Sequence, residues 1–175
     1  MPRLCWTQRS GFPNNPPMFD ADPLALASWS EVSLRLGLAA FLGLLIGLDR
    51  ELRGHDAGIR THALVSLSSA MIMVSSLMLA MQMGEHGDRP DPLRAIQGLS
   101  QAIGFIAAGM IFVRRGAVVN MTTAANIWIA AAIGIACGCG QYRIVVVGAV
   151  LAILLLVVVR AVERWLPREK NDSKG

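Results

Sequence analysis

Charged side chains are scarce in this sequence, and the few present are gathered into short clusters. Asp, Glu, Lys and Arg make up 16% of the 175 residues, whereas a soluble domain carries about 25% charged residues. Hydrophobic residues make up 54%, and the longest apolar stretches contain no charged residue at all. This composition argues against a soluble fold.

Cysteine is also rare, which limits the chemistry that the chain supports. The sequence holds Cys5, Cys137 and Cys139, which are too few for a disulfide framework. Cys137 and Cys139 are two positions apart and would point to different sides of a helix, which argues against a zinc or redox site. We therefore expect neither a bound metal nor a cofactor.

Recognisable catalytic motifs are missing as well. The sequence contains no nucleophile–base pair, phosphate-binding loop or metal-protease motif, and no segment between the apolar stretches is long enough for a catalytic domain. Residues 1–29 contain five prolines but no apolar core, so they predict a flexible tail and not a signal peptide. The chain is predicted not to be an enzyme.

Long apolar runs are what the sequence does have. A membrane-spanning helix needs about 20 mostly apolar residues. Four charge-free runs reach or approach this length: 63–84, 95–113, part of 116–142, and 144–159. A further run, 36–48, is long enough only if its helix begins near Ser30 and the side chains of Glu31 and Arg35 extend toward the lipid headgroups. A re-entrant segment is the alternative for this run.

These runs predict an all-α protein, an integral membrane bundle of about five transmembrane helices. Residues 30–160 would form the transmembrane domain, between the N-terminal tail at 1–29 and a basic cytoplasmic tail at 161–175. The lipid bilayer is therefore the first partner that the sequence predicts.

The positions of Lys and Arg predict the orientation, because positive charge near helix ends favours the cytoplasmic side. With five spans, the first loop, the third loop and the C-terminal tail share one side, and this side holds most of the Lys and Arg residues. We therefore expect the N-terminus outside and the C-terminus inside. The net charge of +4 fits this orientation signal, and no basic surface with interleaved aromatic residues suggests nucleic-acid binding. The positive residues on the predicted inner side are Arg50, Arg53, Arg60, Arg114, Arg115, Arg160, Arg164, Arg168, Lys170 and Lys174.

Small residues recur at helical spacing within the runs. Helices in lipid associate through close packing of small residues and through hydrogen bonds. In the run 116–142, every fourth position from Thr122 is polar or small: Thr122, Asn126, Ala130, Gly134 and Gly138. Packing alone is one interpretation of such rows. The packing residues predicted in this way are Gly43, Gly47, Gly104, Gly109, Gly134 and Gly138.

A cluster of charges follows the apolar run 36–48. Arg50 falls on the same helix face as Gly43 and Gly47, so it is predicted to point into the bundle. Asp49 and Arg53 are four apart and are spaced to pair, and Asp49 or Glu51 is expected to pair with one of the loop arginines. The structural interpretation is a salt-bridge cluster that ends the helix and fixes its orientation.

The functional interpretation is a polar site inside the membrane, since buried ionisable groups in a bundle default to a functional hypothesis. A cation site at Asp49, Glu51 and Asp56 is opposed by the three arginines of the same loop. The complete polar site would join residues around the first loop with residues at the start of the fourth span: Asp49, Arg50, Glu51, Arg60, Thr61, Asn120, Thr122, Thr123 and Asn126.

Four stretches in the same order resemble the MgtC/SapB family of bacterial inner-membrane proteins. They are GLLIGLDRE at 43–51, GIRTHALV at 58–65, IGFIAAG at 103–109 and TTAANIW at 122–128. The resemblance covers roughly residues 32–160 and implies five helices in the bacterial inner membrane. The acidic position of the family falls on Asp49, where many members have Glu, and its polar position in the fourth helix falls on Asn126.

The resemblance also implies roles attributed to MgtC, which are growth at low Mg²⁺, survival inside macrophages and virulence. MgtC proteins are associated with control of membrane potential and with inhibition of the F-type ATP synthase. Two departures stand out: Ala107 occupies a position where Gly is usual, and the soluble C-terminal α/β domain of MgtC has no counterpart before Gly175. We therefore expect the membrane part alone, which housekeeping members also share.

Two functions follow from these expectations. The first is a regulatory membrane protein that docks its helices against another membrane complex, with the F-type ATP synthase, small membrane peptides or a second copy of the chain as partners. The second is a transporter of Mg²⁺ or another cation, which would need acidic groups at mid-membrane. Every Asp and Glu lies near a predicted helix end or in a tail, so the sequence favours the regulator.

Overall fold

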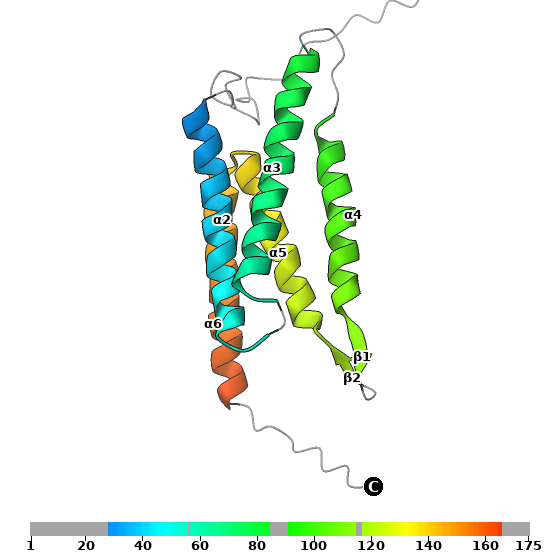
Figure 1. Cartoon of the computed structure of the whole chain (residues 1–175). Helices are drawn as coiled ribbons and strands as arrows, with labels where there is room; N and C mark the ends of the chain where they lie inside the picture. The colour runs from blue at the N-terminus through cyan, green and yellow to red at the C-terminus, as the bar shows by residue number, and fades with distance from the viewer. Residues whose placement is uncertain (1–27, 56, 85–90, 115–116, 166–175) are drawn as a thin grey trace, which may run out of the picture.

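In the part of the chain that the structure describes, five α-helices run up and down in a bundle (Figure 1). The computed structural model describes residues 28–55, 57–84, 91–114 and 117–165. In this part of the chain the only strands form a two-stranded sheet, so the predicted all-α membrane bundle is confirmed. The helices are α2 (Trp29–Glu51), α3 (Ile59–Gly84), α4 (Leu93–Met110), α5 (Met121–Gly138) and α6 (Tyr142–Trp165).

Three segments among the described helices are long and apolar enough to cross a membrane: Trp29–Glu51, Ile59–Met83 and Met121–Gly138. Tyr142–Leu156 forms a shorter apolar helix. Large hydrophobic side chains cover the outer surface, and Phe105 on α4 is 82% exposed. Such a surface is stable in hydrocarbon and unfavourable in water, so the chain is a membrane protein.

The N-terminal tail that the sequence predicts lies almost entirely outside the described residues. Of the predicted C-terminal tail, residues 161–165 continue α6 without a break, and 166–175 lie outside the described part. The helical domain therefore extends at least to Trp165 and not only to residue 160.

Glycines bring α2, α3 and α5 together at backbone distance. A Cβ atom on Gly43 of α2 would lie 2.7 Å from the His62 carbonyl oxygen of α3, and one on Gly47 would lie 2.6 Å from Ile59 Cα. On α5, Gly134 lies directly against the Ser66 carbonyl. Because no side chain separates these backbones, the three helices form the tightly packed centre of the bundle.

The two α4 glycines that the sequence predicts to be packing residues, Gly104 and Gly109, do not make such close backbone contacts. A Cβ on Gly104 would be in ordinary contact with Trp128, at 3.5 Å, and one on Gly109 would have nothing within 4 Å. The packing role predicted for Gly109 is therefore wrong for the described part of the chain. Its helix lies at the edge of the bundle, so this face of α4 meets no other described helix (Figure 1).

A β-hairpin connects α4 to α5. Strands β1 (Phe112–Arg114) and β2 (Ala117–Val119) pair antiparallel, with Phe112 opposite Val119. The helix formed by the charge-free run 95–113 therefore ends at Met110, and Phe112 and Val113 of that run belong to strand β1. The β-branched Val113, Val118 and Val119 suit extended backbone, which explains why the helix does not continue into this segment.

The hairpin, the α2–α3 connection and the C-terminal end of α6 lie at one end of the bundle (Figure 1). The end of α3, the start of α4 and the α5–α6 connection lie at the opposite end, together with the start of α2. The loops that carry most of the positive charge are thus grouped at a single end, which we call the basic end.

Candidate functional site

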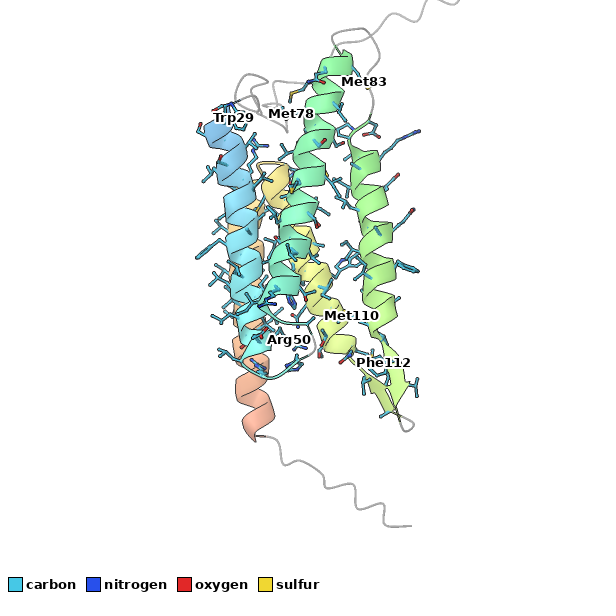
Figure 2. All side chains as sticks on the ribbon, viewed as in Figure 1. Trp29, Arg50, Met78, Met83, Met110 and Phe112 are labelled. Atoms are coloured by element: carbon cyan, nitrogen blue, oxygen red, sulfur yellow. The ribbon has the colours of Figure 1, made fainter. Side chains whose placement is uncertain are left out.

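Arg50 points from the last turn of α2 into the bundle, as its spacing from Gly43 and Gly47 predicts. Its side chain is only 4% exposed. The Nη2 atom donates a 2.6 Å hydrogen bond to the Thr123 hydroxyl of α5 and lies 3.5 Å from the Thr122 hydroxyl. One guanidinium therefore joins the end of α2 to the first turn of α5 (Figure 2, where Arg50 is labelled).

Burial makes this arginine energetically demanding. A charge removed from water requires compensating hydrogen bonds, and threonine hydroxyls supply them without neutralising the charge. The Nε atom of Arg50 is buried and has no hydrogen-bond partner within the described residues. The basic end of the bundle thus contains a buried positive charge with unused hydrogen-bonding capacity.

The acidic neighbours of Arg50 bind elsewhere. Asp49 forms a 2.7 Å salt bridge with Arg53, the pair that the spacing predicts. Glu51 does not pair with an arginine among the described residues; its Oε2 accepts a 3.1 Å hydrogen bond from the backbone N–H of Ile59 and lies against Gly58. Glu51 therefore caps the N-terminus of α3, where a carboxylate is favoured by the helix dipole.

The remaining residues of the predicted polar site only partly converge. Arg60 is exposed on α3, whereas Arg50 is buried. Thr61 is half-buried. Asn120 precedes α5 in a left-handed conformation with φ 67°, and the Asn126 side-chain amide donates to the Thr122 carbonyl at 2.9 Å.

Of the two threonines predicted for the site, Thr123 makes the shorter hydrogen bond to Arg50. Thr123 is fully buried, whereas Thr122 is exposed. Arg50, Thr122 and Asn126 line the same cavity, of about 510 Å³. The structure therefore brings together five of the predicted positions, namely Asp49, Arg50, Thr122, Thr123 and Asn126, and leaves Arg60 outside. Asp56, proposed in the cation alternative, lies outside the described residues.

A polar row on α3 extends from the site toward the centre of the bundle. His62, Ser66 and Ser69 are each fully buried. His62 Nδ1 is 2.8 Å from the Gly58 carbonyl oxygen. The sequence signal was present, because positions 62, 66 and 69 share one helix face, but Ser66 was not singled out among the predicted residues.

A second buried arginine lies at the opposite end of α2. Arg35 is 4% exposed, its Nε donates to Glu31 at 2.8 Å, and its Nη1 donates to the Gly138 carbonyl at 2.9 Å. The Tyr142 hydroxyl also binds Glu31, at 2.6 Å. The expectation that Glu31 and Arg35 extend toward headgroups is wrong for Arg35, because the last carbonyls of α5 lack helical partners and attract its guanidinium into the protein.

This geometry occurs in a chain whose sequence matches a known family. Residues 36–165, which include most of α2 and all of α3 to α6, match the family model described as the MgtC family. The chain belongs to the MgtC family. The match contains Arg50, Thr123 and Asn126, whereas Glu31 and Arg35 lie before it.

Three relatives in the MgtC family illustrate the similarity. The YhiD protein of Escherichia coli K12, whose name proposes magnesium transport, is 41% identical over 130 residues, 74% of this chain and 60% of YhiD. Protein SapB of Bacillus subtilis is 36% identical over 123 residues, 67% of this chain and 53% of SapB. Protein MgtC of Salmonella typhimurium LT2 is 34% identical over 143 residues, 81% of this chain and 58% of MgtC.

The chain spans 60% of the length of YhiD, the relative with 41% identity. No solved structure matches it. Among the residues that the structure describes, no three His, Cys, Asp or Glu side chains are grouped so that they could hold a metal ion. The MgtC-family site presents a buried guanidinium with hydroxyl and amide groups beside it.

Proposed function

We propose that this chain is a non-enzymatic regulatory protein of the bacterial inner membrane that supports growth when magnesium is scarce. It acts on the membrane potential or on the F-type ATP synthase, and in a pathogen it contributes to survival inside macrophages. Membership of the MgtC family supports the role in magnesium limitation. The observation that carries the proposal is Arg50, a buried cation bound to Thr123 at 2.6 Å.

A buried cation favours a regulator over a cation transporter. Arg35 and Arg50 lie near opposite ends of α2, and each is only 4% exposed. A magnesium ion that crossed the centre of the bundle would meet a guanidinium near both ends, and like charges repel strongly where water is excluded. The Arg50–Thr123 bond instead gives the basic end a connection between helices that a partner is able to make or break.

The outer face of α4 is the proposed docking surface for that partner. Phe105 is 82% exposed, and a Cβ on Gly98 or Gly109 would have nothing within 4 Å. Small residues on a lipid-facing helix allow the backbone of a second helix to approach closely. The F-type ATP synthase, a small membrane peptide and a second copy of this chain are the candidate partners.

The orientation proposed is N-terminus outside and C-terminus inside. The Arg-rich α2–α3 connection, the hairpin and the end of α6 are grouped at the basic end (Figure 1). The positive-inside rule assigns such an end to the cytoplasm. Arg50 then lies near the cytoplasmic surface, where a cytoplasmic signal reaches it.

Complementation and ion flux together test this function. A deletion strain is expected to grow poorly at low Mg²⁺ and to survive poorly in macrophages, and the wild-type chain restores both. The purified chain in liposomes is expected to show no saturable Mg²⁺ uptake above empty vesicles. Full growth of the deletion strain at low Mg²⁺ would contradict the proposal.

Transport of magnesium or another cation is the alternative function, and the name of YhiD favours it. Saturable Mg²⁺ flux through the purified chain, abolished by a substitution inside the bundle such as His62→Ala, would establish transport and overturn the regulator. Recovery of ATP synthase subunits with the tagged chain from native membranes would instead support the regulator.

A further inference from the structure

A cavity of about 510 Å³ opens at the basic end, between α2, α5 and α6. Its wall has two chemically distinct parts. One part is polar and is formed by the last turn of α2, the α2–α3 connection and the start of α5. The other part is apolar and is formed by residues deeper in the bundle. The polar residues are Arg50, Arg53, His55, Thr122 and Asn126, and the apolar ones are Ile46, Ala125, Ile129, Ala152, Leu155 and Leu156.

The polar part has hydrogen-bonding groups that no described residue satisfies. Arg50 Nε, Arg53 Nε and His55 Nδ1 are buried and have no hydrogen-bond partner within the described residues. Arg50 is 96% buried, and its two hydrogen-bond partners are neutral hydroxyls. Buried polar groups are normally hydrogen-bonded. Arg53 is already paired with Asp49, so it is the buried Arg50 guanidinium, with the unpaired ring nitrogen of His55 beside it, that indicates a ligand which accepts hydrogen bonds and carries negative charge.

The apolar part lies where an acyl chain would run. Ile46 is four residues before Arg50, about 6 Å deeper along α2, and Ile129 is seven residues after Thr122, about 10 Å deeper along α5. Ala152, Leu155 and Leu156 of α6 complete this wall. Free phosphate would use only the polar part and leave the apolar wall uncovered.

We propose that this cavity binds an anionic phospholipid of the inner leaflet. The phosphodiester accepts hydrogen bonds from Arg50, Arg53 and His55, and one acyl chain lies along Ile46, Ile129 and Leu156. Arginine is suited to phosphate because its planar fork donates two parallel hydrogen bonds. Phosphatidylcholine carries a choline cation that the two arginines repel, so the site discriminates by headgroup charge.

Lipid binding would connect the Arg50 site to the composition of the membrane. The phosphate reaches the guanidinium that also holds Thr123, so occupancy changes the strength of the α2–α5 connection. This inference rests on the Arg50 site of the proposed function and adds its ligand. Its test measures lipid binding to the purified chain, whereas the proposed function is tested by growth. A failure of the lipid inference is therefore distinguishable from a failure of the proposed function.

Native mass spectrometry of the full chain in a neutral detergent provides the test. Phosphatidylglycerol and phosphatidylcholine with identical acyl chains are added at equal concentration, and the fraction of protein that retains each lipid is measured. We expect phosphatidylglycerol to be retained about tenfold more, because Arg50 and Arg53 repel the choline cation of phosphatidylcholine. Arg50→Gln is expected to remove this preference.

Two further variants control for misfolding. Ala152→Phe places a ring inside the cavity from α6 without touching Arg50, and it is expected to reduce retention of phosphatidylglycerol to a similar extent. Arg94→Gln removes the same charge from an exposed position on α4 and is expected to retain the lipid as the wild type does. Thermal unfolding of each variant in the same detergent identifies any that fail to fold.

Three results would overturn the proposal. Equal retention of the two lipids would show that the site does not select an anionic headgroup. Unchanged retention in a folded Ala152→Phe variant would place the lipid elsewhere. Displacement of phosphatidylglycerol by an equal concentration of inorganic phosphate would assign the cavity to free phosphate and not to a lipid headgroup.

Discussion

Arg50 Nη2 donates a 2.6 Å hydrogen bond to the Thr123 hydroxyl, joining two residues that are 73 positions apart in the sequence. The neighbouring Thr122 hydroxyl is 3.5 Å from the same atom, at the limit of a hydrogen bond. The geometry therefore distinguishes two adjacent threonines, and this distinction is open to experiment.

Thr123→Val is expected to destabilise the protein by about 1–3 kcal/mol, because it leaves a buried charged donor without its acceptor. Valine has nearly the same shape as threonine, so packing is little changed. Thr122→Val is the matched control and should have a much smaller effect. The measurement is the unfolding midpoint in detergent, and equal effects of the two substitutions would refute the assignment.

Gly134→Ala tests the close contact between α5 and α3. The added methyl group would collide with the Ser66 carbonyl, a backbone atom that cannot rotate away, so we expect a loss of about 1–3 kcal/mol or more. Gly98→Ala, where a Cβ meets nothing within 4 Å, is expected to be neutral or to stabilise α4 by up to about 1 kcal/mol. Thermal unfolding of both variants checks the contrast, which disappears if the crossing is looser than described.

Tyr142→Phe tests the second buried arginine cluster. The substitution removes the 2.6 Å hydrogen bond to Glu31 and is expected to destabilise the start of α6 by about 1–3 kcal/mol. A double-mutant cycle with Glu31→Gln should give a coupling of about 0.5–3 kcal/mol. Strict additivity of the two substitutions would show that the hydroxyl and the carboxylate do not interact.

Asp49→Ala and Asn126→Ala are expected to abolish complementation at low Mg²⁺ while leaving membrane insertion intact. Asp49 holds Arg53 at 2.7 Å, and Asn126 lines the cavity beside Thr122. Gln101→Ala, on the exposed face of α4, is the control. Full growth of both site variants, with the protein present in the membrane fraction, would eliminate the polar site as a functional element.

Cysteine labelling tests the proposed orientation. In a chain with its native cysteines replaced by alanine, Leu52→Cys and Val118→Cys lie at the basic end, and Leu93→Cys lies at the opposite end, all three at exposed positions. A membrane-impermeant maleimide applied to spheroplasts is expected to label position 93 only. Labelling of 52 and 118 in intact spheroplasts would invert the orientation.

Much of this arrangement is predictable from local sequence. Charge-free runs of sufficient length identify the helices, since only helices and closed barrels satisfy the backbone inside lipid. The direction of Arg50 follows from its spacing to Gly43 and Gly47, because residues three and four apart share a helix face. These predictions succeed because each depends on residues within a single helix.

The predicted row from Thr122 to Gly138 does not stay on one helix face, and the reason is geometric. A row of every fourth residue drifts around the helix, so Thr122 lies about 120° from Gly134 on an ideal helix, whereas Thr123 lies within about 20°. Gly134 contacts α3, so the buried hydroxyl is the one that shares its direction. The row was followed too far along the helix to remain on one face.

The prediction that the Arg35 side chain extends toward the headgroups is wrong for a different reason. Four residues after Glu31, near the start of a span, an arginine is typical of a side chain that extends toward the headgroups. Its actual partner is the Gly138 carbonyl, 103 positions away. Only the tertiary arrangement of α2 against the end of α5 brings that carbonyl within reach, and no local pattern reports it.

The glycine contacts between α2, α3 and α5 imply that some helices of the bundle move relative to one another more easily than others. Three helices in backbone contact resist sliding past one another, because any register shift forces a carbonyl into a Cα atom. α4 packs against these three helices through side chains and not through backbone contacts, for example Trp128 of α5 against Gly104. A spectroscopic probe on α4 at Phe105 would therefore move relative to α2, α3 and α5 when a partner binds. Such a probe would report docking without disturbing the packing of these three helices.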